Sequence, residues 1–342
     1  MSIADTDLVE VLRDGVSSKA TGSQINDYLT PSGYQIQNSI DFGKGSGTMS
    51  SNTTSREFYT TERDYHSNKM KDVAMSFWIK PASVNSDQWL YSAYNEFGAD
   101  ENIQIGVRSN GVFTAQFGGS TSSTYGNFIT KNGWIKANVW QHVFFRWSHY
   151  EMTRTDGAND TERFAAIEIW IDGVKLSLSD MAQCGPGLDC GSSRPAYAFN
   201  MANGSSSPDT SYNAEYLCVG GQMEGRSRLM TAKIAEYCIV TLPDALCWSN
   251  IKTPNWANLP DVHQFGKFNG EGKWVAIDPL ESTQIKWKDA NPAKSPIVWY
   301  LDFKDANALW KSPATDFDFV NTGSIATGVD SSYQSTDTPT SI

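Results

Sequence analysis

The chain has 342 residues, of which 12% are aromatic and 19% are charged, and its net charge is −11. This acidic balance excludes nucleic acid as the main partner, because neutralising phosphates requires clustered Lys and Arg. No apolar run reaches about 18 residues, so we expect no membrane insertion. The opening residues 1–5 lack the basic and apolar regions of a secretory signal, so we expect no signal peptide.

Residues 1–35 form a distinct opening unit. The sequence predicts a strand up to Arg13, a turn at Asp14-Gly15, a return strand, and a short helix over residues 22–29. The unit is too short to bury its own apolar side chains, so we expect it to dock on its own domain or on a neighbouring subunit. The docking residues we expect are Leu8, Val9, Val11, Leu12, Ile25, Tyr28 and Leu29.

The middle of the chain reads as a series of strands. Asn110-Gly111 stands between two alternating segments and is a strong hairpin signal, because both central positions of a type I′ turn need positive φ. Strands are expected at residues 40–43, 72–80, 88–94, 103–108, 112–117, 140–147, 167–176, 216–221 and 230–240.

The segment 138–176 predicts the centre of an antiparallel sandwich. Ile167, Ile169 and Ile171 alternate with Glu168, Trp170 and Asp172, so the isoleucines share one face of a strand. Asp172-Gly173 predicts a tight hairpin after that strand. We expect the core to contain Phe77, Ile79, Val143, Phe145, Ile167, Ile169, Ile171 and Ile234.

The C-terminal third is less regular. Pro243–Ile251 is typical of a short helix, and residues 297–303 predict one more strand. The Ser-, Thr- and Gly-rich stretch 321–342 would be a solvated tail if left alone. Five cysteines lie between Cys184 and Cys247 without the spacing of a zinc site, and we expect them to be reduced.

Signals for catalysis are weak. Glu168 and Asp172 lack the third carboxylate of a glucanase strand and are better explained as an outward strand residue and a turn residue. No nucleotide-binding motif is present. We therefore expect no enzymatic activity. Exposed aromatic residues beside amides are the chemistry of glycan binding, and the candidates are Tyr94, Asn95, Tyr125, Asn127 and Trp134.

Two resemblances refine these expectations. The pattern ADTDL…VLRDGVSSKATGSQINDYL resembles the short opening module of many structural and tail proteins of tailed phages. The ordered motifs MSFWIKP, IGVRSNGVFTAQF, NVWQHVFFRW, IEIWIDGVKL, LCVGGQ and AKIAEYCIVTLPDALCW resemble a concanavalin A-like, laminin-G type jelly roll over residues 36–252. The second resemblance implies an all-β fold of two packed antiparallel sheets.

The resemblance to laminin-G domains also concerns individual residues. It implies that His142 is structural, within a core strand. Cofactors are not expected, although laminin-G domains often bind calcium at the rim, where Asp100, Glu101 and Asn102 would be the ligands.

Together these observations predict three regions: a docking and oligomerisation module at 1–35, a jelly roll at 36–252, and a C-terminal extension at 253–342. The expected function is that of a non-enzymatic virion structural protein, a capsid decoration or tail-associated protein, assembled in the host cytoplasm and located in the virion. Its expected partners are other virion proteins and further copies of itself. The alternative is a carbohydrate-binding adhesin that recognises host surface glycans.

Overall fold

A computed structural model of the chain describes residues 8–13, 16–21, 34–44, 58–59, 72–94, 103–117, 126–153, 161–184, 198–200, 216–220, 230–241, 256–279, 297–307, 309, 320–321 and 331–339. Across these residues the fold is an antiparallel β-sandwich with short 3₁₀ turns, as the sequence predicts. No helix in this part of the chain is long and apolar enough to cross a membrane. The helices expected at 22–29 and Pro243–Ile251 lie outside the described residues.

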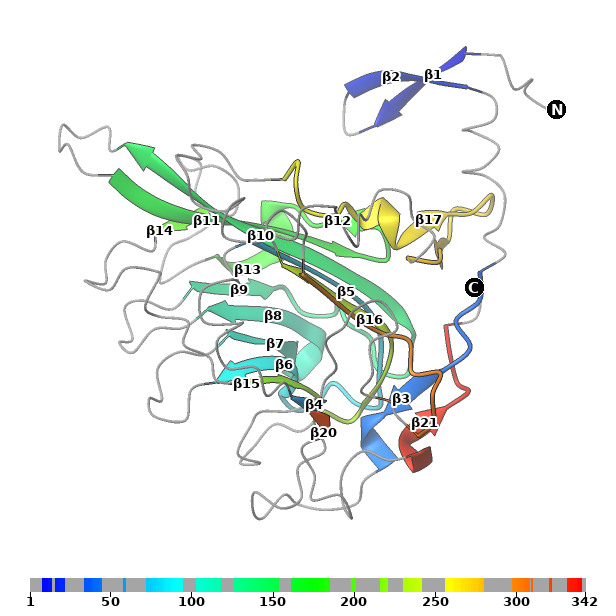
Figure 1. The fold of residues 1–342 in the computed structure, drawn as a ribbon. Coiled ribbons are helices and arrows are strands. Elements are labelled where there is room, and N and C mark those ends of the chain that lie inside the picture. The colour runs from blue at the N-terminus through cyan, green and yellow to red at the C-terminus, as the bar shows by residue number, and fades with distance from the viewer. Residues whose placement is uncertain are drawn as a thin grey trace.

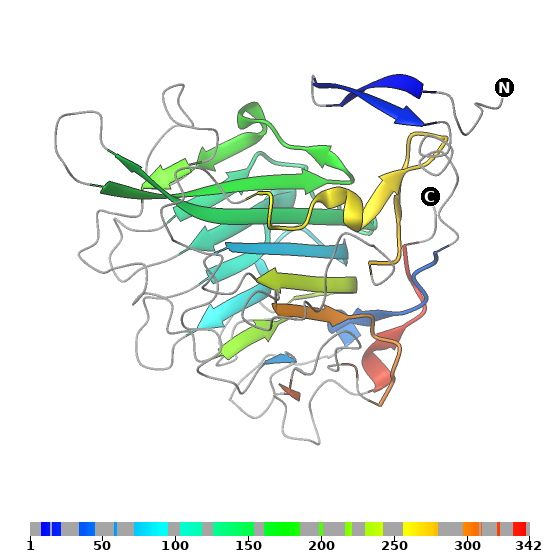
Figure 2. The ribbon, with the colours of Figure 1, turned by 45° about the horizontal axis from the view of Figure 1, so that its top comes forward.

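Two large sheets face each other in the sandwich (Figures 1 and 2). The nine-stranded sheet runs in the order β12 (Val174–Lys175), β11 (Thr161–Ile171), β10 (Gln141–Thr153), β5 (Asp72–Pro81), β16 (Ala232–Thr241), β3 (Ser39–Asp41) and β21 (Gln334–Ser335), with β14 (Ala198–Asn200) beside β11 and β19 (Ile297–Leu301) beside β16. The eight-stranded sheet runs in the order β13 (Met181–Cys184), β9 (Gly126–Thr130), β8 (Val112–Phe117), β7 (Ile103–Arg108), β6 (Gln88–Tyr94), β15 (Tyr216–Val219), β4 (Phe58–Tyr59) and β20 (Val320–Asn321).

Smaller elements complete the described chain. Two hairpins form sheets of their own, namely β1 (Leu8–Arg13) with β2 (Val16–Thr21), and β17 (Gly266–Phe268) with β18 (Trp274–Ala276). The 3₁₀ turns are η1 (Phe42–Lys44), η2 (Ser109–Gly111), η3 (Leu178–Asp180), η5 (Val262–Gln264) and η7 (Ser331–Tyr333).

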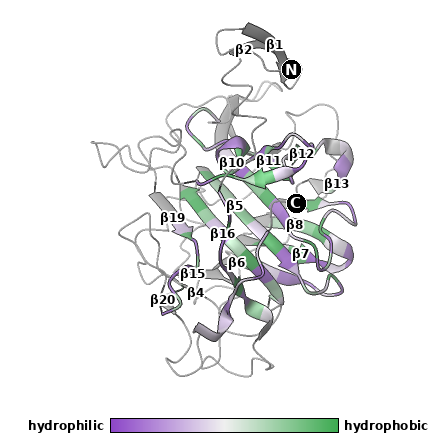
Figure 3. Cartoon of the chain, turned by 90° about the vertical axis from the view of Figure 1, so that its right-hand side faces the viewer, coloured by the Kyte–Doolittle hydropathy of each residue, from purple (hydrophilic) through white to green (hydrophobic). Residues whose placement is uncertain are grey.

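The main core lies between the two large sheets. All eight residues predicted for it are buried there. Phe113 of β8 meets Phe145 of β10 with ring centroids 5.9 Å apart, which joins the two sheets directly. Hydrophobic residues recur along the sandwich strands, including β5 and β16 (Figure 3). The alternation of apolar and polar residues therefore identified the inner face correctly.

A second core covers the outer face of the nine-stranded sheet. Trp78, Phe144 and Trp170 point away from the main core, yet each is at most 6% exposed. Residues 256–279, called the cap below, pack over them through Leu259, Val262, Phe265 and Trp274. Trp170 thus lies on the face opposite the isoleucines, as predicted. It is buried by the cap, which begins almost 90 residues further along the chain.

The predicted turns form as expected. Asp172 (φ 50°) and Gly173 (φ 74°) connect β11 and β12 as a two-residue hairpin. The β7–β8 connection is one residue longer: Ser109 precedes Asn110 (φ 64°) and Gly111 (φ 68°), and Arg108 pairs with Val112. A Cβ on Gly173 would lie 2.1 Å from Cε3 of Trp274, so this glycine is also needed for the close approach of the cap.

Residues from the predicted C-terminal extension contribute to both sheets. β19 pairs with β16, β20 pairs with β4, and β21 pairs with β3. The expectation of a solvated tail is wrong for residues 331–339, because Tyr333 joins the main core and Asp337 is held by two lysines. The division of the chain into three functional regions stays a prediction.

Candidate functional site

The register of the eight-stranded sheet aligns four residues with uncharged polar side chains. Ser92 of β6 pairs with Gln104 of β7, Gln104 pairs with Gln116 of β8, and Gln116 pairs with Asn127 of β9. These four positions, called the polar row below, cross four neighbouring strands in one line. Adjacent strands lie about 4.8 Å apart, so the row extends over about 14 Å.

The backbone positions of the polar row are neighbours of buried core positions along three of the strands. Ile105, Ala115 and Phe128 are each one residue from a member of the row, and all three are fully buried between the sheets. Successive residues of a strand alternate between faces, so the four backbone positions of the row alternate with the strand positions that the main core uses.

Two of the predicted glycan-binding residues lie at the same edge of this sheet. Tyr94 is the last residue of β6, and Asn127 is the second residue of β9. The ladder places the end of β6, the start of β7, the end of β8 and the start of β9 side by side. Asn95 and Tyr125 lie outside the described residues. The alignment of Gln104 with Gln116 cannot be predicted from the sequence, because it depends on the register between β7 and β8.

Trp134 belongs to the opposite end of the sheet. It follows β9 and lies beside the β7–β8 turn, where the N–H of Gly133 donates to the carbonyl of Asn110 and that of Ile135 donates to Gly111. Its side chain is half-buried against the main core. The structure therefore does not bring Trp134 together with Tyr94 and Asn127.

The outer face of this sheet is covered near the β7–β8 turn. Trp89 and Thr114 pair with Gly106 from either side, and both are fully buried. A Cβ on Gly106 would lie 2.9 Å from Cε3 of Trp89, so the indole lies directly over this glycine. The cross-strand line of Trp89, Gly106 and Thr114, which runs alongside the polar row toward the β7–β8 turn, is therefore enclosed.

A buried carboxyl group lies on the other sheet. Glu236 sits where the register of β16 shifts against β5, its backbone is left-handed with φ 49°, and it is 6% exposed. The hydroxyl of Tyr34 donates to its Oε1 over 2.6 Å, while its Oε2 has no hydrogen-bond partner among the described residues. Burial raises the pKa of Glu236 to about 8 and so favours its neutral, protonated form.

His142 is also buried and is structural, as expected. Its Nδ1 accepts from the indole N–H of Trp274 over 3.0 Å, and its Nε2 lies 2.8 Å from the hydroxyl oxygen of Ser76. An indole N–H can only donate, so Nε2 carries the proton of the neutral ring. Burial lowers the pKa of His142 to about 3. The histidine thus fastens the cap to the nine-stranded sheet.

Glu168 likewise has a structural partner. Its carboxylate accepts from Arg146 over 2.7 Å and from Lys175 over 2.6 Å. Arg146 also donates to the carbonyl of Pro260 over 3.1 Å and lies 4.7 Å from the ring centroid of Trp256. These contacts attach the cap to β10 and β11, and they leave Glu168 in an ion-pair network.

The expected calcium ligands and the expected docking residues of the opening unit have no described side chains. Within the described part of the chain, no group of three or more His, Cys, Asp or Glu residues could hold a metal ion. The calcium candidates Asp100, Glu101 and Asn102 lie outside it, as do Ile25, Tyr28 and Leu29. Leu8, Val9, Val11 and Leu12 lie on β1, which pairs with β2 over six residue pairs.

Comparisons with known proteins give only distant likenesses. Neither a protein-family model nor a curated protein matches the sequence. The carbohydrate-binding module CBM40 of the Ruminococcus gnavus IT-sialidase, solved with α2,3-sialyllactose, is 11% identical with a TM-score of 0.33, over 53% of this chain and 84% of that one. A SAP-like pentraxin from Limulus polyphemus is 11% identical with a TM-score of 0.32, over 60% of this chain and 77% of that one. The NanB sialidase of Streptococcus pneumoniae is 11% identical with a TM-score of 0.33, over 64% of this chain and 29% of that one.

The strand order and the two cores define the fold class independently of these likenesses. Over the residues that the structure describes, the chain is an all-β antiparallel sandwich of two large sheets.

Proposed function

We propose that this protein is a non-catalytic, lectin-like module that binds glycans on the outer face of its eight-stranded sheet. The observation that supports this proposal is the polar row. Three of its four members carry side-chain amides, and each amide offers a donor and an acceptor that match the hydroxyl groups of a sugar. Repeated polar positions across strands suit a ligand made of repeated hydroxyl-bearing units.

Tyr94 extends the surface at the edge of the sheet. It lies two residues beyond Ser92 on β6, so strand alternation assigns both positions to the same face. A tyrosine ring packs against the apolar face of a sugar while its hydroxyl remains available for hydrogen bonding. None of the four members of the row is a carboxylate, which fits binding better than hydrolysis.

Glycan arrays and calorimetry test this function. Gln104→Ala together with Gln116→Ala should weaken binding of the best glycan at least about tenfold, since two hydrogen-bonding groups to the ligand are lost. Gln37→Ala is the matched control, because Gln37 is an exposed glutamine next to β3 of the other sheet. Unchanged binding in the double variant would contradict the site. Release of reducing sugar from the bound glycan would contradict the non-catalytic role.

A second proposal concerns where this surface is displayed. The hairpin expected at the start of the phage-like opening module is formed, with Leu8 opposite Thr21 and Arg13 opposite Val16. On the sequence resemblance of this module, we propose attachment to the virion of a tailed phage through residues 1–35, with formation of a homo-oligomer. Deleting residues 1–35 should abolish incorporation into particles and reduce the mass measured by light scattering. A truncated chain that still joins the particle would contradict the attachment role.

A further inference from the structure

The C-terminal segment 331–339 occupies a site built entirely by other parts of the chain. Asp337 accepts hydrogen bonds from Lys80 of β5 at 2.9 and 3.1 Å, from Lys233 of β16 at 2.5 Å and from the indole N–H of Trp140 at 3.0 Å. These donors are 257, 104 and 197 residues away in sequence. Lys80, Lys233 and Trp140 are called the carboxylate cradle below.

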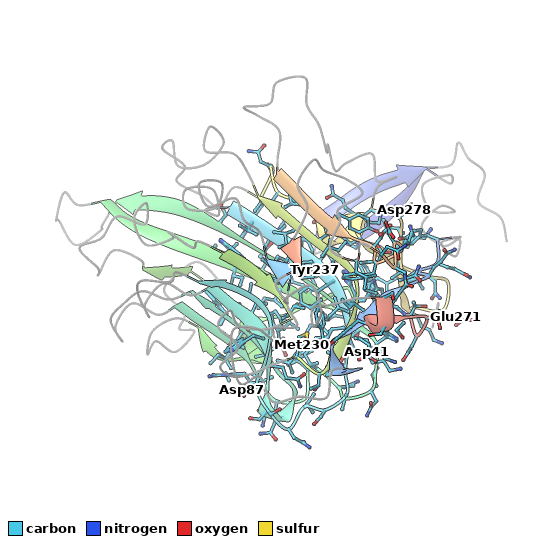
Figure 4. The ribbon with its side chains drawn as sticks, turned by 60° about the horizontal axis from the view of Figure 1, so that its bottom comes forward. Asp41, Asp87, Met230, Tyr237, Glu271 and Asp278 are labelled. Carbon is cyan, nitrogen blue, oxygen red and sulfur yellow. The ribbon has the colours of Figure 1, made fainter. Side chains whose placement is uncertain are left out.

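Further hydrogen bonds fix the segment at Asp337 and at the residues before it. The hydroxyl of Ser39 donates to the carbonyl of Asp337 over 2.7 Å, and β21 pairs with β3 through Ser335 and Ser39. The amide of Gln334 donates to the carbonyls of Phe303 and Lys304 over 2.7 and 3.1 Å. Asp41 of β3 lies beside the segment at this edge of the sandwich (Figure 4).

The segment is therefore held in the manner of a peptide ligand added to a sheet edge. Its strand β21 is itself the last of the sheet order and pairs with β3. The segment also carries one aromatic residue, Tyr333, into the core and presents one carboxylate to three donors. Edge pairing supplies affinity and a side-chain pocket supplies specificity in this mode of recognition. Burial alone would raise the pKa of Asp337, but the hydrogen bonds from Lys233, Lys80 and Trp140 hold it well below its usual value.

We infer that segment 331–339 is an exchangeable strand, and that the carboxylate cradle of one copy can receive the segment of a second copy. Charge complementarity identifies the occupant, since two lysines face the single aspartate of this segment. Each copy carries one cradle and one segment, so exchange between two copies is reciprocal and closes as a symmetric dimer. All contacts of the closed monomer re-form in the exchanged pair, and protein concentration decides between the two states.

A disulfide trap between two full-length chains tests this exchange. One chain carries Ser39→Cys and a first tag, and the other carries Ser335→Cys and a second tag. These positions are direct partners on antiparallel strands, so their Cα atoms lie about 4.5–5.5 Å apart, within the range for a disulfide. After mixing at high concentration and mild oxidation, we expect a covalent species with both tags and a 39–335 disulfide by mass spectrometry.

The double variant Ser39→Cys/Ser335→Cys in one chain is the control for geometry. It should form the bond within the chain and then fail to exchange. If the control forms its disulfide fully and the mixture gives no species with both tags, exchange is overturned. If the control forms no disulfide, the docking of the segment on which exchange depends is itself wrong.

Asp337→Asn in both chains tests the role of the cradle. Undocking must break the contacts of the carboxylate, so this change should speed formation of the mixed disulfide at least about tenfold without altering its final yield. Glu271→Gln is the matched control, because Glu271 is an exposed acid on the cap and pairs with Lys273. Equal rates for Asp337→Asn and Glu271→Gln would refute the cradle as the contact that holds the segment.

Discussion

Ile169 illustrates how a single residue contributes to the main core. It is 1% exposed, and its partner across β10 is Phe145, which is fully buried. Ile169→Ala removes buried methyl groups and leaves a cavity, so we expect a loss of roughly 2–5 kcal/mol of unfolding free energy. Urea denaturation measures this loss.

Val174→Ala is the matched control for Ile169→Ala. Val174 lies on β12 beside the same strand, but 51% of its surface is exposed. Its truncation should change the unfolding free energy by less than about 0.5 kcal/mol. Similar losses for the two variants would show that Ile169 does not belong to the core.

Among the contacts that dock the cap on the sheet, the turn at Asp172-Gly173 admits Trp274 most directly. Gly173 and Gly133 both have left-handed backbones, with φ of 74° and 84°. An added Cβ would collide with Trp274 at Gly173, and at Gly133 it would meet nothing within 4 Å. Gly133→Ala should therefore cost about 1–2 kcal/mol from backbone strain.

Gly173→Ala should cost more than Gly133→Ala. The collision displaces Trp274 from His142 and leaves a buried acceptor without its donor, which adds about 1–3 kcal/mol. Urea denaturation measures both losses, and hydrogen exchange over residues 256–279 should increase only in Gly173→Ala. Equal losses and unchanged exchange would show that the turn does not position the cap.

Local signals explain which elements the sequence could predict. The turns at Asn110-Gly111 and Asp172-Gly173 depend on backbone preferences of two adjacent residues, and the inner face of β11 depends on alternation over five residues. The burial of Trp170 could not be predicted in this way, because its cover comes from the cap.

The same limit applies to both candidate binding regions. The polar row exists only through the register of four strands, and no single strand reveals it. Asp337 lies in a stretch with few apolar residues, which composition alone assigns to solvent. Its partners Lys80 and Lys233 belong to strands far away in sequence, so its docking follows from topology.

Two buried ionisable groups, His142 and Glu236, change the folding stability of the molecule in opposite directions as pH rises. The pKa of His142 falls from 6.5 to about 3 on folding, so its contribution to stability is fully present above pH 6.5 and is lost as pH falls toward 3. The pKa of Glu236 rises from 4.5 to about 8, so its contribution is fully present below pH 4.5 and is lost as pH rises toward 8. Burial is the main cause of both shifts.

These dependences predict greatest stability between pH 4.5 and 6.5, where the two slopes, each at most about 1.4 kcal/mol per pH unit, offset each other. Of these two groups, only Glu236 contributes a loss above pH 6.5, and only His142 contributes one below pH 4.5. Glu236→Gln keeps an acceptor for Tyr34 and cannot ionise, so its stability relative to the unchanged protein should increase steadily from pH 4.5 to 8. Urea denaturation at intervals over this range provides the measurement. A difference between the two proteins that stays constant with pH would mean that Glu236 is not a buried neutral acid.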